Sequence, residues 1–298
     1  MALLTLVGGC MKIGYIGLGL MGFPCVLNLI RSGYHVSVWA RRPEASSALE
    51  AQSAVLCDSP AAVALASDIV FLNVTNAPDV EELLFGPNGI ASSQKKGLIV
   101  VDMSTISATL TREFAARLAP MGIEFADAPV SGGTAGAKAG SLTFMVGASE
   151  NLFARIAPVL ESMGTTITRI GETGAGQIAK SCNQICITAS ILGVAEARAF
   201  AEANGVDFAP VREALMGGFA GSTVLKLHGQ RMISNDYSPG FKSALHLKDM
   251  KIVDDIAAEQ HLPMPVSAIG VEMLQRAVDA GFGEEDSSAM AKVLPGKR

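Results

Sequence analysis

The sequence has few charged residues and no long run of one sign. Charged side chains make up 17% of its 298 residues, and the formal net charge is −5. There is no basic stripe of the kind that binds nucleic acid and no Lys/Arg-rich amphipathic face that would bind a membrane surface. The longest uncharged apolar stretches fall short of a membrane span. We therefore expect neither nucleic-acid nor membrane partners, and an anionic substrate must be held by local cationic groups.

Cysteine is scarce as well. The five cysteines are odd in number and scattered, which favours free thiols in a reducing cytoplasm over a disulfide framework. Cys182 and Cys186 lie one helical turn apart, but no His or third Cys accompanies them, so we expect no metal site. Residues 1–10 lack a positively charged region, and strand-like sequence begins at Met11, so a signal peptide is not expected. Met11 is therefore a second candidate for the start of the chain.

Hydrophobic residues make up 49% of the sequence, enough for two domains with buried cores. Over residues 1–172, β-rich runs alternate with amphipathic helical runs. This order predicts an α/β domain with a doubly wound, parallel Rossmann sheet whose two faces are covered by helices. Strands are expected at residues 12–17, 35–39, 69–73, 98–102, 124–128 and 142–146, and helices at residues 21–32, 78–84, 110–121 and 151–163.

After residue 171 the strand pattern stops. A long apolar helix is expected over residues 174–203, ended by Asn204-Gly205. Asp207 is placed to cap the next helix. Further helical runs are expected at residues 209–216, 223–233, 241–260 and 266–280. The sequence thus predicts an all-α domain over residues 173–298 that completes the substrate cleft.

A G-x-G-x-x-G motif follows the first predicted strand and opens the first helix, over residues 17–22. Gly17 permits the tight turn, Gly19 lets a pyrophosphate approach the backbone, and Gly22 allows close packing of helix on strand. We expect this segment, including Leu18 and Met21, to hold the pyrophosphate of a dinucleotide at the helix N-terminus. The alternative is an ordinary glycine-rich βα turn.

The end of the second strand favours NADP (NADPH) over NAD. Sites selective for NAD usually carry an acidic residue there, which bonds the ribose hydroxyls. Here Ala40 takes that place, and Arg41 and Arg42 follow. Guanidinium groups suit a 2′-phosphate. The alternative is that both arginines are solvated surface charges.

A second glycine-rich segment follows the strand over residues 124–128. Ser131 and the backbone N–H groups of Gly132 and Gly133 could hold a carboxylate at this sheet edge. A plain glycine-rich loop is the alternative.

Lys180 and Asn183 are spaced i, i+3 on the long helix and so share a face. A lysine within an apolar helix is unexpected. Burial lowers a lysine pKa, which would suit proton exchange with an alcohol or carbonyl oxygen. The alternative is a lysine that lies along a domain seam with its charge in water.

Taken together and in this order, these motifs resemble the β-hydroxyacid dehydrogenase family. That family includes 3-hydroxyisobutyrate dehydrogenase, tartronate semialdehyde reductase and the glyoxylate/succinic semialdehyde reductases. The resemblance covers nearly the whole chain from Met11. It is carried by residues 17–22, 127–140, 174–183 and 246–249.

The resemblance implies roles for the residues that face the substrate. Lys180 would be the catalytic acid and base, and Asn183 would orient the substrate. Ser131, Gly132 and Gly133 would bind its carboxylate.

Other roles implied by the resemblance concern the cofactor. Lys248 would lie near the nicotinamide and the substrate, and Thr105 near the nicotinamide ribose. Asn73 and Val74 stand where the family commonly has Leu-Pro, at a turn that contacts the cofactor.

The implied reaction is NADPH-dependent reduction of a short-chain semialdehyde acid to the hydroxy acid, as in 2-hydroxy-3-oxopropionate (tartronate semialdehyde) reductases. Residues 217–223 favour that branch, although they also fit a helix-breaking turn. A glyoxylate/succinic semialdehyde reductase and a 3-hydroxyisobutyrate dehydrogenase are the alternatives. Imine reductases and cofactor-binding interaction modules of related sequence lack the lysine, so Lys180 argues against both. We expect a cytoplasmic homo-oligomer, a dimer or a tetramer, without a metal.

Overall fold

The computed structural model describes residues 11–294, apart from the side chains of residues 43–46. Two compact units divide between Lys180 and Ser181, inside one long helix, so that helix contributes to both. The predictions made for residues 1–10 lie outside the described residues.

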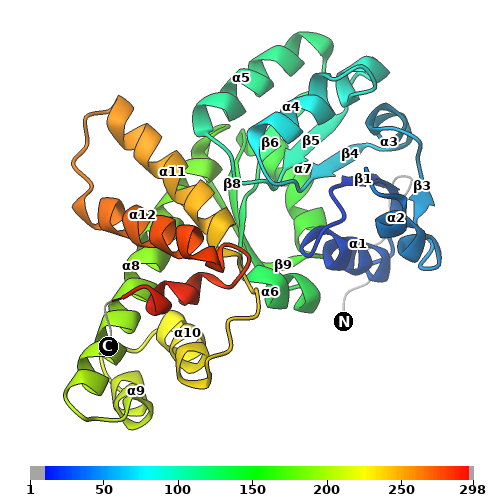
Figure 1. The fold of residues 1–298 in the computed structure, drawn as a ribbon. Helices are drawn as coiled ribbons and strands as arrows, with labels where there is room; N and C mark the ends of the chain where they lie inside the picture. The colour runs from blue at the N-terminus through cyan, green and yellow to red at the C-terminus, as the bar shows by residue number, and fades with distance from the viewer. Residues whose placement is uncertain (1–10, 295–298) are drawn as a thin grey trace. The chain divides into compact units, whose positions relative to one another are not determined.

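The first unit is built on a sheet whose first six strands have the doubly wound order β3-β2-β1-β4-β5-β6 (Figure 1). These six strands are parallel. The strand β8 follows β6 and is antiparallel to both β6 and β7, whereas β9 is parallel to β8. The strands are β1 (Lys12–Ile16), β2 (His35–Trp39), β3 (Val55–Leu56), β4 (Ile69–Leu72), β5 (Ile99–Asp102), β6 (Glu124–Asp127), β7 (Val130–Ser131), β8 (Leu142–Gly147) and β9 (Gly164–Gly171).

Helices cover both faces of this sheet. Ile69 and Phe71 of β4 belong to one buried apolar cluster and Val70 and Leu72 to the other, because successive side chains of a strand point to opposite faces. The first cluster includes residues of α1 (Gly22–Arg31), α2 (Pro43–Glu50), α6 (Gly133–Ala139) and α7 (Glu150–Leu160). The second includes residues of α3 (Pro60–Ala66), α4 (Ala77–Phe85), η1 (Ile90–Ser93) and α5 (Ala108–Leu118), which η2 (Ala119–Met121) follows. This double cover explains why β4 is apolar at every position.

The sequence missed the short elements β3, β7, α2, α3 and α6 and the edge strand β9. Each of β3 and β7 has two residues, too few to show a periodic pattern. β9 lies at the edge beyond β8, and most of its side chains are partly or fully exposed. The central strands were predicted from apolar runs. An exposed edge strand such as β9 does not need such a run, so it was not recognised. The predicted doubly wound parallel sheet is confirmed over β1 to β6, and β8 adds antiparallel pairings with β6 and β7 at one side of it.

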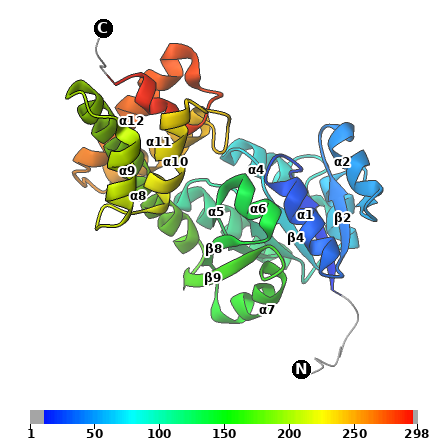
Figure 2. The same ribbon diagram turned by 90° about the horizontal axis from the view of Figure 1, so that it is seen from below.

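The second unit is helical, as expected. Its elements are the C-terminal part of α8 (Ala175–Ala203), α9 (Phe208–Met216), α10 (Thr223–Ser234), α11 (Ser243–Glu259), α12 (Pro265–Ala277), η3 (Val278–Phe282) and η4 (Ser287–Lys292). Figure 2 shows α9 to α12 gathered along that part of α8. Asp207 caps α9 as predicted, since its side chain accepts a hydrogen bond from the Ala209 N–H. A Cβ atom on Gly270 of α12 would lie 2.5 Å from Thr188 Cγ2 of α8, so these two helices require glycine to pack this closely.

Among the described residues, one helix is long and apolar enough to cross a membrane by length and composition. This is α8, with a mean hydropathy of 1.3 over its most apolar window; it contains Lys180, Glu196 and Arg198, so the expectation for uncharged stretches is not contradicted. The core helix of a globular protein passes the same test. Gln177, Gln184 and Thr188 on α8 each form hydrogen bonds with other elements of their own unit. These contacts are those of a helix packed within the protein.

Candidate active site

The carboxyl ends of four parallel strands meet at one edge of the sheet. Ile16 of β1 is in register with Leu72 of β4, and Leu72 with Asp102 of β5. Asp102 is in register with Asp127 of β6. Open α/β sheets bind ligands at this edge, beside the point where the strand order reverses, here between β1 and β4. The predicted site residues that follow these four strands are Gly17, Asn73, Val74, Thr105 and Ser131.

The glycines after β1 have the geometry of a dinucleotide cradle. Gly17 has a φ of 105°, and a Cβ atom there would lie 2.1 Å from the Asn73 carbonyl oxygen. A Cβ on Gly22 would lie 1.9 Å from the Gly17 oxygen, whereas one on Gly19 would meet no atom within 4 Å. Gly17 and Gly22 are therefore required by the fold, and Gly19 leaves the open backbone that a pyrophosphate needs. The residues present fit the cofactor.

The start of α1 also suits an anion. No side chain caps this helix end and its first turn carries no acidic residue, so the positive end of the helix dipole is not neutralised from within the helix. Leu18 is buried in the apolar core and Met21 is partly buried against it. Any contact between Leu18 and a dinucleotide would therefore be through its backbone.

The predicted arginines lie at the end of β2. The Arg41 guanidinium is 3.0 Å from the Asp79 carboxylate in the first turn of α4, and its side chain is 70% exposed. Arg42 is also exposed, and Ala40 is partly buried. An exposed ion pair of this kind contributes little to stability. Arg41 can therefore leave Asp79 for a phosphate at small cost. Asp79 was not predicted as the partner of Arg41, because it lies on α4, far along the chain from the end of β2.

Hydrogen bonds join the turns after β4 and β5 to α8. The Val74 N–H donates to Ser104 Oγ at 2.9 Å, and the Ser104 N–H donates to Asp102 Oδ1 at 2.9 Å. Gln177 Nε2 of α8 donates to the Ser104 carbonyl oxygen at 2.8 Å. Together these bonds hold the loop that carries Thr105.

Asn73 is tied to the core beneath the cradle. Its Nδ2 donates to the Tyr15 hydroxyl at 3.1 Å. Tyr15 is fully buried, and this burial raises its pKa well above the ordinary value, so it stays a neutral hydroxyl. The side chain of Asn73 is therefore occupied in supporting the turn.

A buried carboxylate fixes the start of the helix that carries Lys180. Asp127 is fully buried and accepts hydrogen bonds from the N–H groups of Gly174, at 2.6 Å, and Gln177, at 2.8 Å. Burial raises the pKa of Asp127 to about 6, although these N–H groups act to lower it. A Cβ on Gly176 would lie 2.8 Å from Asp127 Oδ2, so the contact is tight. Lys180, which is 8% exposed, comes three residues after Gln177.

The structure places Ser131 in the short strand β7, where it is in register with Thr143 of β8. Gly132 and Gly133 follow with φ values of 125° and 58°, which favour glycine, and lead into α6, whose start has no side-chain cap. Ser131 and Gly133 are partly buried and Gly132 is exposed. The three predicted carboxylate ligands are thus accessible on one turn.

The remaining predicted residues belong to the second unit. Asn183 is partly buried on α8, three residues after Lys180, and its Nδ2 donates to Gln184 Oε1 at 2.8 Å. Lys248 of α11 pairs with Asp249, with 2.9 Å between Nζ and Oδ1. The segment of residues 217–223 joins α9 to α10, and Ser222 caps the second of these helices.

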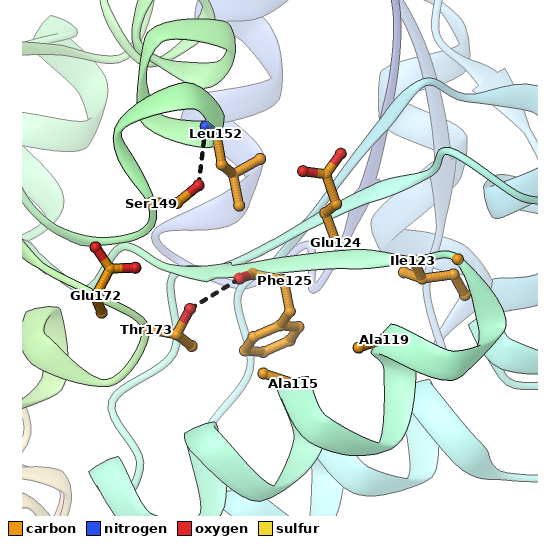
Figure 3. A pocket seen from close by; sticks show the side chains of 10 residues that line it. Ala115, Ala119, Ile123, Glu124, Phe125, Ser149, Leu152, Glu172 and Thr173 are labelled. Atoms are coloured by element: carbon orange, nitrogen blue, oxygen red, sulfur yellow. Dashed lines mark hydrogen bonds between the residues drawn. The ribbon is translucent and has the colours of Figure 1, made fainter.

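A separate surface hollow of about 350 Å³ lies among α5, the start of β6 and the first turn of α7 (Figure 3). It includes none of the predicted site residues. Its acidic side chains Glu124 and Glu172 are paired with Arg155 and Arg169. The hollow therefore offers no concentration of unbalanced charge for a ligand.

Two family models together match most of the chain. Residues 12–171 match the family described as the NAD binding domain of 6-phosphogluconate dehydrogenase. Residues 174–294 match the family described as the NAD-binding domain of NADP-dependent 3-hydroxyisobutyrate dehydrogenase. The chain is 43% identical over 284 residues to a 2-hydroxy-3-oxopropionate reductase from Escherichia coli (strain K12), covering 95% of this chain and 97% of the relative.

Solved structures show the same architecture. A 3-hydroxyisobutyrate dehydrogenase from Mycobacterium tuberculosis, solved with L-serine, superposes with a TM-score of 0.88 at 29% identity, over 96% of this chain and 100% of that one. Psf3, solved in complex with NADP+ and 2-OPP, superposes with a TM-score of 0.86 at 26% identity, over 95% and 100%. The fold and its glycine cradle define an NAD(P)-dependent oxidoreductase. The chain belongs to the β-hydroxyacid dehydrogenase family.

Proposed function

We propose that this protein reduces a short-chain semialdehyde acid to the corresponding hydroxy acid with NADPH, and that 2-hydroxy-3-oxopropionate is its substrate. One observation carries the proposal: a buried lysine, Lys180, lies on a helix whose first turn is bonded to Asp127, at the sheet edge that also holds the glycine cradle. The 43% identity to a 2-hydroxy-3-oxopropionate reductase supports the choice of substrate.

Each residue has a distinct task in this proposal. The backbone over residues 17–22 would hold the pyrophosphate, and NADPH, when bound, supplies the hydride. The Ser131 hydroxyl and the N–H groups of Gly132 and Gly133 hold the carboxylate of the substrate, which positions the aldehyde carbon. Asn183, one turn beyond Lys180 on α8, orients the aldehyde group.

Lys180 acts on the aldehyde oxygen. Its ammonium group donates a proton to this oxygen as negative charge develops there, and the neutral amine accepts the proton in the reverse direction. Its positive charge also stabilises the developing alkoxide, which is usually the larger contribution to the rate. Burial strengthens this effect because water screens the charge less.

The end of β2 supports the proposed preference for NADPH. Ala40 offers no carboxylate to the ribose hydroxyls, and Arg41 needs only to leave an exposed contact with Asp79 to reach a 2′-phosphate. The Psf3 structure contains NADP+ and is consistent with this preference.

The test is a comparison of aldehydes and cofactors. Oxidation of NADPH and NADH is followed with 2-hydroxy-3-oxopropionate, methylmalonate semialdehyde, succinate semialdehyde and glyoxylate. We expect the highest kcat/KM with 2-hydroxy-3-oxopropionate and NADPH. A higher value with another aldehyde would reassign the substrate. Equal use of NADH and NADPH would contradict the assignment of the arginines, and no turnover with any aldehyde would contradict the reductase itself.

A further inference from the structure

A chain of buried polar side chains in the second unit links the two predicted site residues of that unit. Lys248 Nζ is 2.9 Å from Asp249 Oδ1, and Gln184 Nε2 donates to Asp249 Oδ2 at 2.7 Å. Asn183 Nδ2 in turn donates to Gln184 Oε1 at 2.8 Å. The middle of this chain is buried, with Asp249 at 4% and Gln184 at 2% exposed. The ends, Asn183 and Lys248, are only partly buried.

The chemistry of Asp249 fixes the direction of every bond in the chain. A carboxylate only accepts hydrogen bonds, so Gln184 must turn its NH₂ group toward Asp249. The Gln184 carbonyl oxygen then faces Asn183, and Asn183 must donate its own NH₂ group to it. The carbonyl oxygen of the Asn183 side chain is then left to accept a hydrogen bond from a substrate hydroxyl or from the ammonium group of Lys180.

We propose that Asp249 is a positioning residue of the active site, which sets the amide orientation of Asn183 through Gln184 and holds Lys248 by direct ion pairing. The inference rests on the proposed function, because Asp249 can affect catalysis only if Asn183 and Lys248 have the roles proposed for them. A buried carboxylate is costly unless it is fully bonded, and here Oδ1 accepts from Lys248 and Oδ2 from Gln184.

An asparagine cannot replace this carboxylate. In Asp249→Asn one oxygen remains to accept, so either Lys248 or Gln184 meets an NH₂ group instead. If Gln184 turns to accept from that group, Asn183 must turn as well and present its NH₂ group. Gln184→Met tests the link to Asn183 by itself, since it removes that link and leaves the ion pair of Lys248 with Asp249.

A matched control lies one turn further along α8. The Thr188 hydroxyl donates to the backbone carbonyl oxygen of Gln184 at 2.7 Å and is 2.8 Å from His246 Nε2 of α11. It is buried at 1% exposure and joins the same two helices, but the chain from Asn183 to Lys248 does not include its side chain. Thr188→Val therefore removes a buried helix-to-helix bond and leaves the amide orientation of Asn183 unchanged.

The first measurement is steady-state kinetics with 2-hydroxy-3-oxopropionate and NADPH. We expect kcat/KM to fall by about tenfold to a hundredfold in Asp249→Asn and in Gln184→Met, because a mispositioned polar group is costly in catalysis. Thr188→Val should be less stable to heat but kinetically close to wild type. If wild type is active and both chain variants match Thr188→Val in kcat and KM, the positioning role is wrong.

The second measurement does not depend on activity. Side-chain amide resonances of protein labelled with ¹⁵N on Asn and Gln are recorded by NMR, with Asn183 assigned by its loss in Asn183→Asp. The Asn183 resonance should shift in Asp249→Asn and Gln184→Met and stay in place in Thr188→Val. An unmoved resonance in Gln184→Met would overturn the chain of bonds, even if Asp249→Asn fails to fold. If wild type reduces none of the aldehydes, the proposed function fails and this measurement alone decides the arrangement.

Discussion

Replacing the buried carboxyl of Asp127 by an amide should remove a pH dependence of stability between about pH 4 and pH 6. The pKa of Asp127 is raised from 3.8 to about 6 in the folded protein, mainly by burial. The folded state therefore binds a proton more tightly than the unfolded state. The free energy of unfolding falls as the pH rises through this window and is constant above it. A difference of about two pKa units corresponds to about 3 kcal/mol.

The assay is urea unfolding of wild type and Asp127→Asn from pH 4 to pH 7. The single tryptophan, Trp39, lies on β2 of the same unit as Asp127, so its fluorescence follows unfolding of that unit. Wild type should lose up to about 3 kcal/mol relative to the variant between pH 4 and pH 6. Parallel stability curves for the two proteins, or a relative gain by wild type as the pH rises, would refute the reasoning.

Asp286 has the opposite pH dependence and a different window. Its burial opposes ionisation, but hydrogen bonds from His228 and Ser288 hold its pKa well below the ordinary value. The stability that it contributes is present above about pH 4 and is lost as the pH falls further, because the unfolded carboxyl then takes up a proton first. Both proteins in the comparison carry Asp286, so its effect cancels in their difference.

Three further predictions concern binding. Gly19→Ala should fold normally, because open space surrounds Gly19, and should raise the NADPH Kd. Gly17→Ala should instead be destabilised, because its Cβ atom would clash with the Asn73 carbonyl oxygen. Equal melting temperatures for the two variants would contradict this pair of predictions. Ser131→Ala should raise the KM of the aldehyde and leave NADPH affinity nearly unchanged, and an unaltered KM for every acid would remove Ser131 from the carboxylate site. Ala40→Asp combined with Arg41→Ala should raise the NADPH KM by about tenfold to a hundredfold and improve NADH use, since a charge-assisted phosphate contact is lost. Unchanged cofactor KM values would contradict the last prediction.

The sequence predicted the central strands and the glycine cradle because their signals are local. β4 is an apolar run, as expected for a strand buried on both faces, and the roles of Gly17 and Gly22 follow from a motif between a strand and a helix. The edge strand β9 was missed because an exposed strand needs no apolar run.

The supporting polar groups could not be predicted in the same way. Asp127 bonds the backbone of Gly174 and Gln177, which are 47 and 50 residues away in the sequence, and Asp249 bonds Gln184 across 65 residues. Such contacts depend on how the elements pack. Asp127, Gln177 and Asp249 do stand within the motifs that carry the family resemblance, so the sequence marked the right segments without giving their roles.

The most direct test of the central claim is the turnover of Lys180→Ala with NADPH and 2-hydroxy-3-oxopropionate, alongside Lys180→Arg. Loss of the proton donor should lower kcat by about 10² to 10⁴. Arginine should fail as well, because its pKa is too high to exchange a proton. NADPH binding, measured by fluorescence titration, should be retained. A Lys180→Ala protein that folds, binds NADPH and keeps near wild-type turnover would contradict the account.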